Sequence, residues 1–266
     1  MPAAGNFVTA TLSGGTLKIV ANDSSSAPEN DNNITVYQFP EGDTVYTYVE
    51  GNGTEVRGGP GFTNVKNIDI RMNRGYDIVH IEGVQLDGTL SINQGSGGGE
   101  TYITDGGGQG LIGPSIVFGK TGSNIKGLTT VTGTEGADLL VVLGSTFGAF
   151  TANLKAGNDE VDINGSTFTA PLLLNTDKGN DDVYIDSGEF SYFYGASQFG
   201  FPNVLSVTVS LGDGDDYLLI GDTSSSNFLG VAIFGGGNGI DYYDYYNSGA
   251  PAAVGFGGFE NGLKPR

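Results

Sequence analysis

A seven-residue pattern recurs along the chain and constrains its fold more than any other feature. The pattern is glycine, any residue, an acidic residue, and apolar residues two and four places after the acid. Its clearest copies are residues 157–163 and 179–185. Internal repetition of this kind is the sequence signature of a repeat architecture. The related copies begin at Gly75, Gly136, Gly214 and Gly239, and a degenerate copy with a glutamate begins at Gly98.

The alternation after each acidic residue predicts a short β-strand with one buried face. Strands this short cannot bury a core alone, so equivalent strands from successive repeats must stack on one another. The residues predicted to face inward are Val79, Ile81, Tyr102, Leu140, Val142, Val161, Ile163, Val183, Ile185, Leu218, Ile220 and Tyr243. The residues predicted to face outward are His80, Ile103, Val141, Asp162, Tyr184, Leu219 and Asp244.

The spacing of the repeats supports stacking. Asp138, Asp159 and Asp181 are separated by 159 − 138 = 21 and 181 − 159 = 22 residues, which is room for one coil of two or three short strands. The longer steps, 100–138 and 181–216, predict loops that leave the stack. A third strand is expected before each corner, as in residues 207–211 and 231–234. A second ladder is expected nine residues after the acid, at Leu86, Phe147, Phe168 and Phe190.

These patterns predict an all-β chain that forms a right-handed parallel β-helix, which is a solenoid. The coils are expected over residues 62–248, after an irregular β cap at residues 1–61 and before a C-terminal cap or tail at residues 249–266. Within the N-terminal cap we expect strands at 15–20, 33–37 and 43–49, the last entering a hairpin turn at 50–53. Glycine suits the coil corners because it adopts a left-handed backbone without steric cost.

Charge and composition exclude several classes of function. The formal net charge of −19 repels nucleic acid and anionic lipid, so neither is an expected partner. The chain has no cysteine, which excludes disulfides and thiolate metal sites. No apolar run is long enough to insert across a bilayer. Residues 1–5 lack the features of a signal peptide, so a secreted protein would be represented here without its leader.

The corner pattern resembles the calcium-binding RTX nonapeptide of haemolysin-type proteins. Residues 236–244 match the nonapeptide in full, and residues 155–162 and 177–184 match its second half. RTX arrays repeat the motif every nine residues, whereas here it occurs once per coil. The whole chain is similar to the Gly/Asp-rich repeat regions of bacterial surface and exported proteins, of which residues 12–19 and 62–70 are typical. That resemblance implies an extracellular or cell-surface location, a structural or adhesive role, and carbohydrate or other surface proteins as partners.

Stacked corners would place their acidic residues in a column with a spacing of about 4.8 Å. Like charges at that separation raise one another's pKa or recruit a cation. Calcium suits such a column because it accepts carboxylate and carbonyl oxygens in flexible geometry. The alternative is that each carboxylate accepts hydrogen bonds from amides of its own turn and stays solvated. The predicted Ca²⁺ ligands are Asp138, Asn158, Asp159, Asn180, Asp181, Asp215, Asp216 and Asp241.

A polysaccharide-binding or polysaccharide-cleaving β-helix is the alternative function. Residues 175–177 and 181–182 resemble the Asn-Thr-Asp and Asp-Asp motifs of polygalacturonase-like glycosidases. The Gly-His-Gly and Arg-Ile-Lys motifs of that family are absent, and His80 lies several coils earlier. His80 is expected to be a solvent-facing strand residue, and no catalytic residue is assigned. The prediction is therefore a non-catalytic structural or adhesive module that calcium stabilises.

Overall fold

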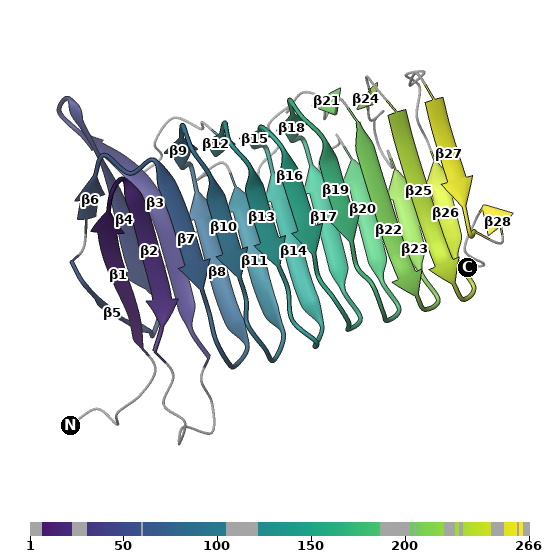
Figure 1. Ribbon diagram of the computed structural model, residues 1–266, viewed down its shortest axis with the longest axis horizontal. Coiled ribbons are helices and arrows are strands. Elements are labelled where there is room, and N and C mark those ends of the chain that lie inside the picture. Colours follow the sequence, from purple (N-terminus) through teal and green to yellow (C-terminus); the bar gives the residue numbers. More distant parts are fainter. Residues whose placement is uncertain are drawn as a thin grey trace.

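A computed structural model shows an all-β molecule, with no helix among the residues it describes. The strands lie side by side along an elongated body, with the N-terminal strands at one end and β27 and β28 at the other (Figure 1). The described residues are 7–22, 31–59, 61–104, 122–186, 203–204, 206–220, 227–228, 231–245, 253–259 and 261–262.

The strands form three sheets, which we call the first, second and third. The first has the order β27 (Ala253–Gly257), β25 (Val231–Asn238), β22 (Val207–Asp213), β19 (Leu172–Asn175), β16 (Phe150–Asn153), β13 (Thr129–Thr132), β10 (Leu90–Asn93), β7 (Asn67–Arg71), β2 (Thr16–Ala21), β1 (Phe7–Ser13), β5 (Glu55–Arg57). The second has the order β28 (Asn261–Gly262), β26 (Tyr242–Tyr245), β23 (Tyr217–Ile220), β20 (Asp182–Asp186), β17 (Glu160–Asn164), β14 (Asp138–Leu143), β11 (Gly99–Thr104), β8 (Asp77–Glu82), β3 (Asn33–Glu41), β4 (Thr44–Gly51), β6 (Gly61–Thr63). The third has the order β24 (Asn227–Phe228), β21 (Asn203–Val204), β18 (Thr167–Phe168), β15 (Thr146–Phe147), β12 (Asn124–Ile125), β9 (Gln85–Leu86).

From β7 to β26 the chain visits the three sheets in turn, so neighbours within a sheet come from successive repeats. From β7 and β8 onward every pairing between described strands is parallel. Val161 pairs with Leu140 on one side and with Val183 on the other, as the repeat predicts. The strands expected at 207–211 and 231–234 are β22 and β25.

The core lies between the sheets and is built from columns of like residues. Eleven of the twelve residues predicted to face inward are at least partly buried on the inner face of the second sheet. All of the valine, leucine and isoleucine residues among them are fully buried. Tyr243 is half-buried and stacks on Phe256 with ring centroids 4.3 Å apart. In the third sheet, Leu86, Phe147 and Phe168 lie in one ladder as predicted, and the two phenylalanine rings stack at 5.3 Å. Ile125, which the prediction did not include, occupies the ladder between Leu86 and Phe147.

The prediction was wrong for the degenerate copy of the repeat. Gly99, and not Glu100, pairs with Asp77 and Asp138. Ile103 is therefore buried and Tyr102 faces outward beside His80, the reverse of the expectation. Apolar alternation sets the register here, because a shift by one residue would turn the buried Ile103 to the outer face.

The expected loops and one member of the second ladder lie outside the described residues. The undescribed residues 105–121 fall between β11 and β12, and residues 187–202 fall between β20 and β21. Phe190 belongs to the second of these stretches. Val204 pairs with Phe168 at the ladder position expected for Phe190.

The N-terminal strands extend the two large sheets with antiparallel pairs. β2 and β3 pair in parallel with β7 and β8, whereas β1 and β4 fold back antiparallel on β2 and β3. The predicted hairpin turn at 50–53 was wrong. The turn between β3 and β4 is at Gly42, and after β4 the chain crosses to the first sheet, where β5 pairs with β1.

Glycine at the repeated corner is required by close approach as well as by backbone conformation. Gly157 and Gly179 occupy equivalent positions, with φ of 144° and 135°. A Cβ added to Gly179 would lie 1.5 Å from the carbonyl oxygen of Gly157. Any side chain at this position would therefore separate the stacked coils.

Candidate functional site

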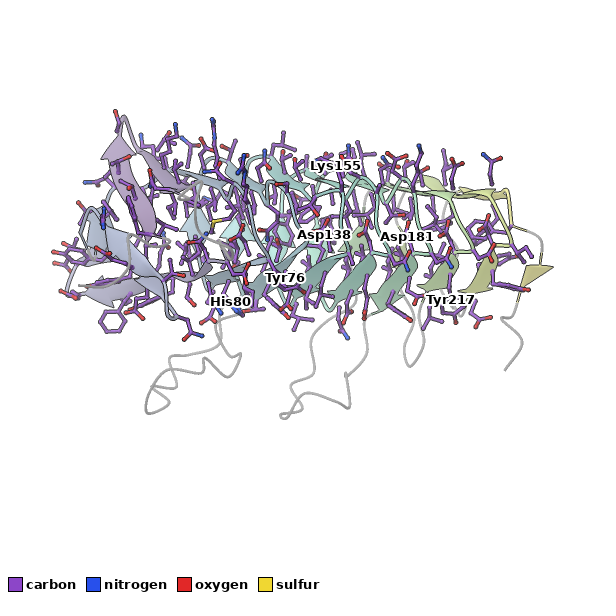
Figure 2. The ribbon with its side chains drawn as sticks, turned by 90° about the horizontal axis from the view of Figure 1, so that it is seen from below. Tyr76, His80, Asp138, Lys155, Asp181 and Tyr217 are labelled. Atoms are coloured by element: carbon purple, nitrogen blue, oxygen red, sulfur yellow. The ribbon has the colours of Figure 1, made fainter. Side chains whose placement is uncertain are left out.

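The acidic residues of the repeat form a column inside the molecule, at the corner where the chain passes from the first sheet to the second. Asp138 and Asp181 lie between the two large sheets (Figure 2). The side chains are almost completely withdrawn from solvent, because no member is more than 5% exposed. This inner column consists of Asp77, Asp138, Asp159, Asp181, Asp216 and Asp241.

Hydrogen bonds link the inner column from coil to coil. The amide of Asp138 donates to Oδ1 of Asp159 at 2.9 Å, and the amide of Asp159 donates to Oδ1 of Asp181 at 2.8 Å. The amide of Asp181 donates to Oδ1 of Asp216 at 2.8 Å, and that of Asp216 to Oδ1 of Asp241 at 3.1 Å. The carboxylates of Asp159, Asp181, Asp216 and Asp241 therefore accept from the coil on their N-terminal side.

A second ladder runs beside the inner column in the opposite direction. Its side chains precede the aspartates by one residue and are exposed. The amide of Asn180 donates to Oδ1 of Asn158 at 2.9 Å, and the amide of Asp215 donates to Oδ1 of Asn180 at 3.0 Å. The amide of Ile240 continues the series to Asp215 at 2.9 Å. This outer ladder and the inner column together join each corner to both of its neighbours.

Burial makes the inner carboxyls hold their protons more tightly. Desolvation raises the pKa of Asp159 to about 8, although its hydrogen bond from the Asp138 amide acts in the opposite direction. For the same reason the pKa of Asp216 rises to about 7 and that of Asp138 to about 6. The pKa of Asp181 is also raised, mainly by desolvation. A charged column is therefore unfavourable unless a proton or a cation neutralises it.

The predicted calcium ligands divide between these two ladders. Asp138, Asp159, Asp181, Asp216 and Asp241 lie in the inner column, whereas Asn158, Asn180 and Asp215 lie in the outer ladder. Their Oδ1 atoms mostly accept backbone amides already. Within the described part of the chain, no group of three or more His, Cys, Asp or Glu residues is arranged to hold a metal.

One feature of the inner column does suit a cation. Among the described residues, the Oδ2 atoms of Asp159 and Asp216 are buried and have no hydrogen-bond partner. A buried anionic oxygen without a partner is costly, so each needs a proton or a positive ion. Calcium takes six to eight oxygen ligands, whereas the inner column offers only one unpartnered Oδ2 atom per coil. Calcium binding here therefore stays a prediction.

The alternative in which the carboxylates stay solvated was wrong for the inner column. The aspartates are buried, and most of them accept an amide from the neighbouring coil and not from their own turn. Asp138 is the exception, since it accepts from the amide of Thr134 at 2.7 Å.

The Asp-Asp pair that resembles a glycosidase motif does not converge on one face of the sheet. Asp181 points into the core, and Asp182 follows it on the strand and points to the outer face. Asp177 is at the exposed corner with φ of 70°, and Asn175 is on the first sheet. Two carboxyls on opposite faces of one strand cannot flank a single glycosidic bond as that chemistry requires.

The outer face of the second sheet carries rings and carboxylates that the repeat alone did not identify as a group. His80 stacks on Tyr102 with ring centroids 4.7 Å apart. Glu100 accepts hydrogen bonds from the hydroxyls of Tyr76 at 2.8 Å and Tyr102 at 2.6 Å. His80 and Tyr217 lie along one side of the molecule, away from the buried aspartates (Figure 2). Burial lowers the pKa of His80, which favours its neutral form.

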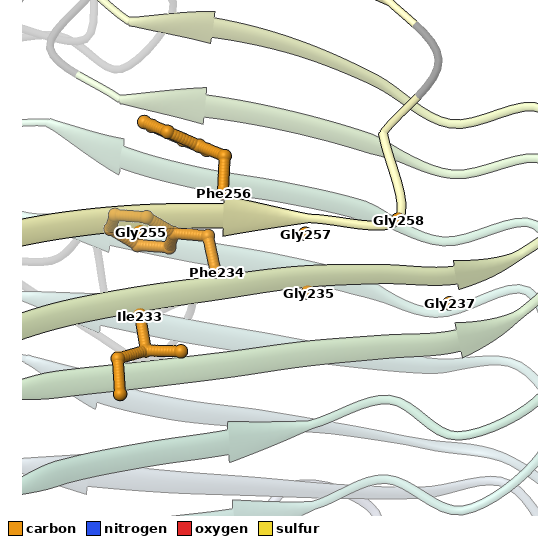
Figure 3. Close-up of a pocket in the computed structure, with 8 residues that line it drawn as sticks. All are labelled: Ile233, Phe234, Gly235, Gly237, Gly255, Phe256, Gly257 and Gly258. Atoms are coloured by element: carbon orange, nitrogen blue, oxygen red, sulfur yellow. The ribbon is translucent and has the colours of Figure 1, made fainter.

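A shallow hollow of about 520 Å³ lies at the C-terminal end of the first sheet (Figure 3). Its lining consists of Ile233, Phe234, Phe256 and five glycines, so it contains no titratable side chain. This hollow offers no group for acid–base or metal chemistry.

Comparison with protein-family models, with curated proteins and with solved structures gives no match to this chain. Among the described residues, no helix is long and apolar enough to span a bilayer.

Proposed function

We propose that the chain is a right-handed parallel β-helix that serves as a secreted or cell-surface structural and adhesive module without catalytic activity. The three sheets support the solenoid, because each is built from successive repeats in parallel register. The right hand follows from the strong preference of parallel strand–crossover–strand units for that hand. The resemblance to bacterial surface proteins supports the location.

The observation that carries the structural role is the pair of hydrogen-bond ladders at the corner. The inner column and the outer ladder run in opposite directions and connect consecutive coils independently of the strand pairing. Neighbouring coils are thus joined by side-chain bonds, strand bonds and a shared core. A repeat protein with strong coupling between neighbours behaves as one stiff unit, which suits a stalk or spacer.

A polysaccharide digest tests the absence of catalysis. The purified chain is incubated with neutral and acidic polysaccharides, and new reducing ends and unsaturated products are measured. We expect no product above that of a heat-inactivated sample. Sustained polysaccharide cleavage that co-purifies with the folded protein would contradict the proposal and support the polysaccharide-cleaving alternative.

Calcium stabilisation belongs to the same proposal, and the buried Oδ2 atoms of Asp159 and Asp216 support it. A cation bound only by the native state raises the melting midpoint by mass action. Melting curves at pH 8 with excess calcium and with excess chelator provide the test, and magnesium serves as the control. Equal midpoints in all three conditions would show that protons, and not calcium, neutralise the column.

A further inference from the structure

We propose that the outer face of the second sheet binds an extended, arginine-rich protein segment. This inference names a partner class for the adhesive role and therefore rests on the proposed function. The face consists of the outward side chains of β8, β11, β14, β17, β20, β23 and β26.

The charge on this face has one sign. Glu160 and Asp182 occupy paired positions on adjacent strands, and Asp162 lies beside Tyr184 in the next column. Glu100 and Asp244 extend the acidic surface toward the two ends of the stack. Among the described outward residues of these seven strands there is no lysine or arginine. A cationic partner therefore meets no like charge along the face.

Tyrosine rings are interleaved with these carboxylates. Tyr184 and Tyr217 pack edge to face with ring centroids 6.1 Å apart. Tyr217 donates its hydroxyl to Asp244 at 2.7 Å, which holds that ring beside a carboxylate. Burial and the nearby Asp182, Glu160 and Asp162 raise the pKa of Tyr184 to about 12, so its ring stays neutral. Neutral rings next to carboxylates recur along several coils.

This combination favours arginine over other cations. A guanidinium group is planar, so it can bond a carboxylate through two N–H groups and also stack on an aromatic ring. A lysine ammonium is a strongly hydrated point charge and lacks the planar surface. The stack also presents equivalent side chains at about 4.8 Å intervals, so an extended segment can meet several coils at once.

The first sheet is the internal contrast. Its outward residues from β10 to Ser210 of β22 are Ser, Thr, Asn and one Leu, and the charged Asp213 lies beyond them at the corner end of β22. Thr130, Thr151 and Thr208 lie in one column and Asn153 and Asn175 in the next. A cationic segment attracted only by the net charge of the whole molecule would bind the two sheets with similar affinity. A segment that recognises carboxylates and rings would bind the second sheet only.

Fluorescence anisotropy with labelled oligo-arginine and oligo-lysine peptides of equal length tests the inference on the whole chain. We expect the arginine peptide to bind about fivefold more tightly than the lysine peptide, the ratio that one added cation–π contact supplies. The difference should persist at physiological salt, because ring stacking is screened less than charge attraction. Equal affinity of the two peptides would overturn the inference.

Variants locate the binding face. Glu160→Gln with Asp182→Asn removes two carboxylates from the centre of the face, and Asp43→Asn with Asp87→Asn removes the same charge elsewhere on the surface. We expect about a fivefold loss of arginine-peptide affinity for the first pair and little change for the second. Tyr184→Leu keeps an apolar side chain and should reduce only the preference for arginine over lysine.

Each outcome decides a separate point. Equal losses in both double variants would show attraction by net charge alone and overturn the inference. Tighter binding of an aminosugar polymer than of the arginine peptide would replace the protein partner with a cationic glycan. Because these measurements do not depend on the polysaccharide digest, failure of the binding face leaves the structural role standing. Melting midpoints confirm that each variant is folded.

Discussion

The corner that carries Asp159 and the corner that carries Gly99 belong to the same stack but are held together differently. At the first, a buried carboxylate accepts the amide of the preceding coil. At the second there is no carboxylate, and Gln94 fills the space, since a Cβ on Gly99 would lie 3.0 Å from its Cδ. Gln94 bonds the carbonyl of Glu100 at 2.9 Å and the hydroxyl of Thr101 at 2.8 Å.

The difference between the two corners shows which residue the stack requires there and which residue it can replace. Glycine recurs at both corners, because the coils approach too closely for a side chain there: a Cβ on Gly97 would lie 2.6 Å from the Gly75 carbonyl oxygen. The aspartate is replaceable when another polar side chain reaches the corner. We therefore expect glycine substitutions to have larger effects than aspartate substitutions.

The largest effect should come from Gly179→Ala. The added Cβ would overlap the carbonyl oxygen of Gly157, and the φ of 135° disfavours any residue other than glycine. We expect a loss of about 4 kcal/mol or more in the free energy of unfolding, or failure to fold. Urea denaturation followed by circular dichroism measures it.

Gly255→Ala is the matched control for that substitution. Gly255 lies in β27, and a Cβ there would meet no atom within 4 Å. We expect a change within about 0.5 kcal/mol. Similar losses at the two positions would show that close approach of the coils is not the reason for glycine at the corner.

The next effect should come from Asp159→Ala. The substitution leaves the Asp138 amide without its acceptor, and Leu154, which occupies the position of Gln94 in that coil, has no polar group to replace it. We expect a loss of about 1–3 kcal/mol at pH 5, the usual cost of an unsatisfied buried group. Asp159→Asn keeps an acceptor oxygen and should lose less. Asn32 provides the precedent, because it occupies this position in an earlier coil and donates to Asp77.

Sequence reasoning predicted the features that depend on apolar periodicity. The pairing of Val161 with Val183 and the ladder through Phe147 and Phe168 follow from alternation and spacing, which are visible in one chain. It did not predict the register at Gly99, because the acidic residue there is one place off the column. The alternation of buried Thr101 and Ile103 was the signal that would have found it.

The burial of the aspartates could not be derived in the same way. The pattern places an acid at each corner but does not say whether its side chain turns inward or stays in water. That choice depends on the amide of another coil, as at Asp159 and Asp181. The aromatic and acidic face also depends on neighbours from different repeats, such as Tyr217 and Asp244.

Stability should fall as the pH rises. Burial raises the pKa of Asp159 from 3.8 to about 8 and that of Asp216 from 3.8 to about 7. The folded state therefore holds protons that the unfolded chain releases, so this stability is complete below about pH 4 and is lost as the pH rises through 8. We expect a higher melting midpoint at pH 5 than at pH 9, measured in excess chelator.

Asp159→Asn assigns part of that dependence to one residue. At pH 9 the variant should melt about 2–4 °C above the unmodified chain, which corresponds to about 1 kcal/mol for a protein of this size. Near pH 5 the two should differ less. Asp43→Asn, at an exposed turn, is the control. An unchanged pH dependence in Asp159→Asn would mean that its carboxyl is already neutralised by something other than a proton.

The smallest effect should come from rebuilding the missing carboxylate at the Gly99 corner. Gly133 leaves room for Asp138 at its corner, because the Oδ2 atom of Asp138 would lie 2.5 Å from a Cβ on Gly133. Gln94→Gly combined with Gly99→Asp copies that arrangement, because the register places Gln94 beside Gly133. We expect the double variant to stay within about 1 kcal/mol of the unmodified chain at pH 5, since one polar corner replaces another.

Gly99→Asp alone should be less stable than the double variant, because the new side chain competes with Gln94 for the same space. The difference between the two variants measures the coupling of these positions. The double variant should also lose more stability between pH 5 and pH 9 than the unmodified chain, since it adds another buried carboxyl to the inner column. If the single and double variants are equally unstable, Gln94 does not stand in for the aspartate, and the contrast between the two corners has another cause.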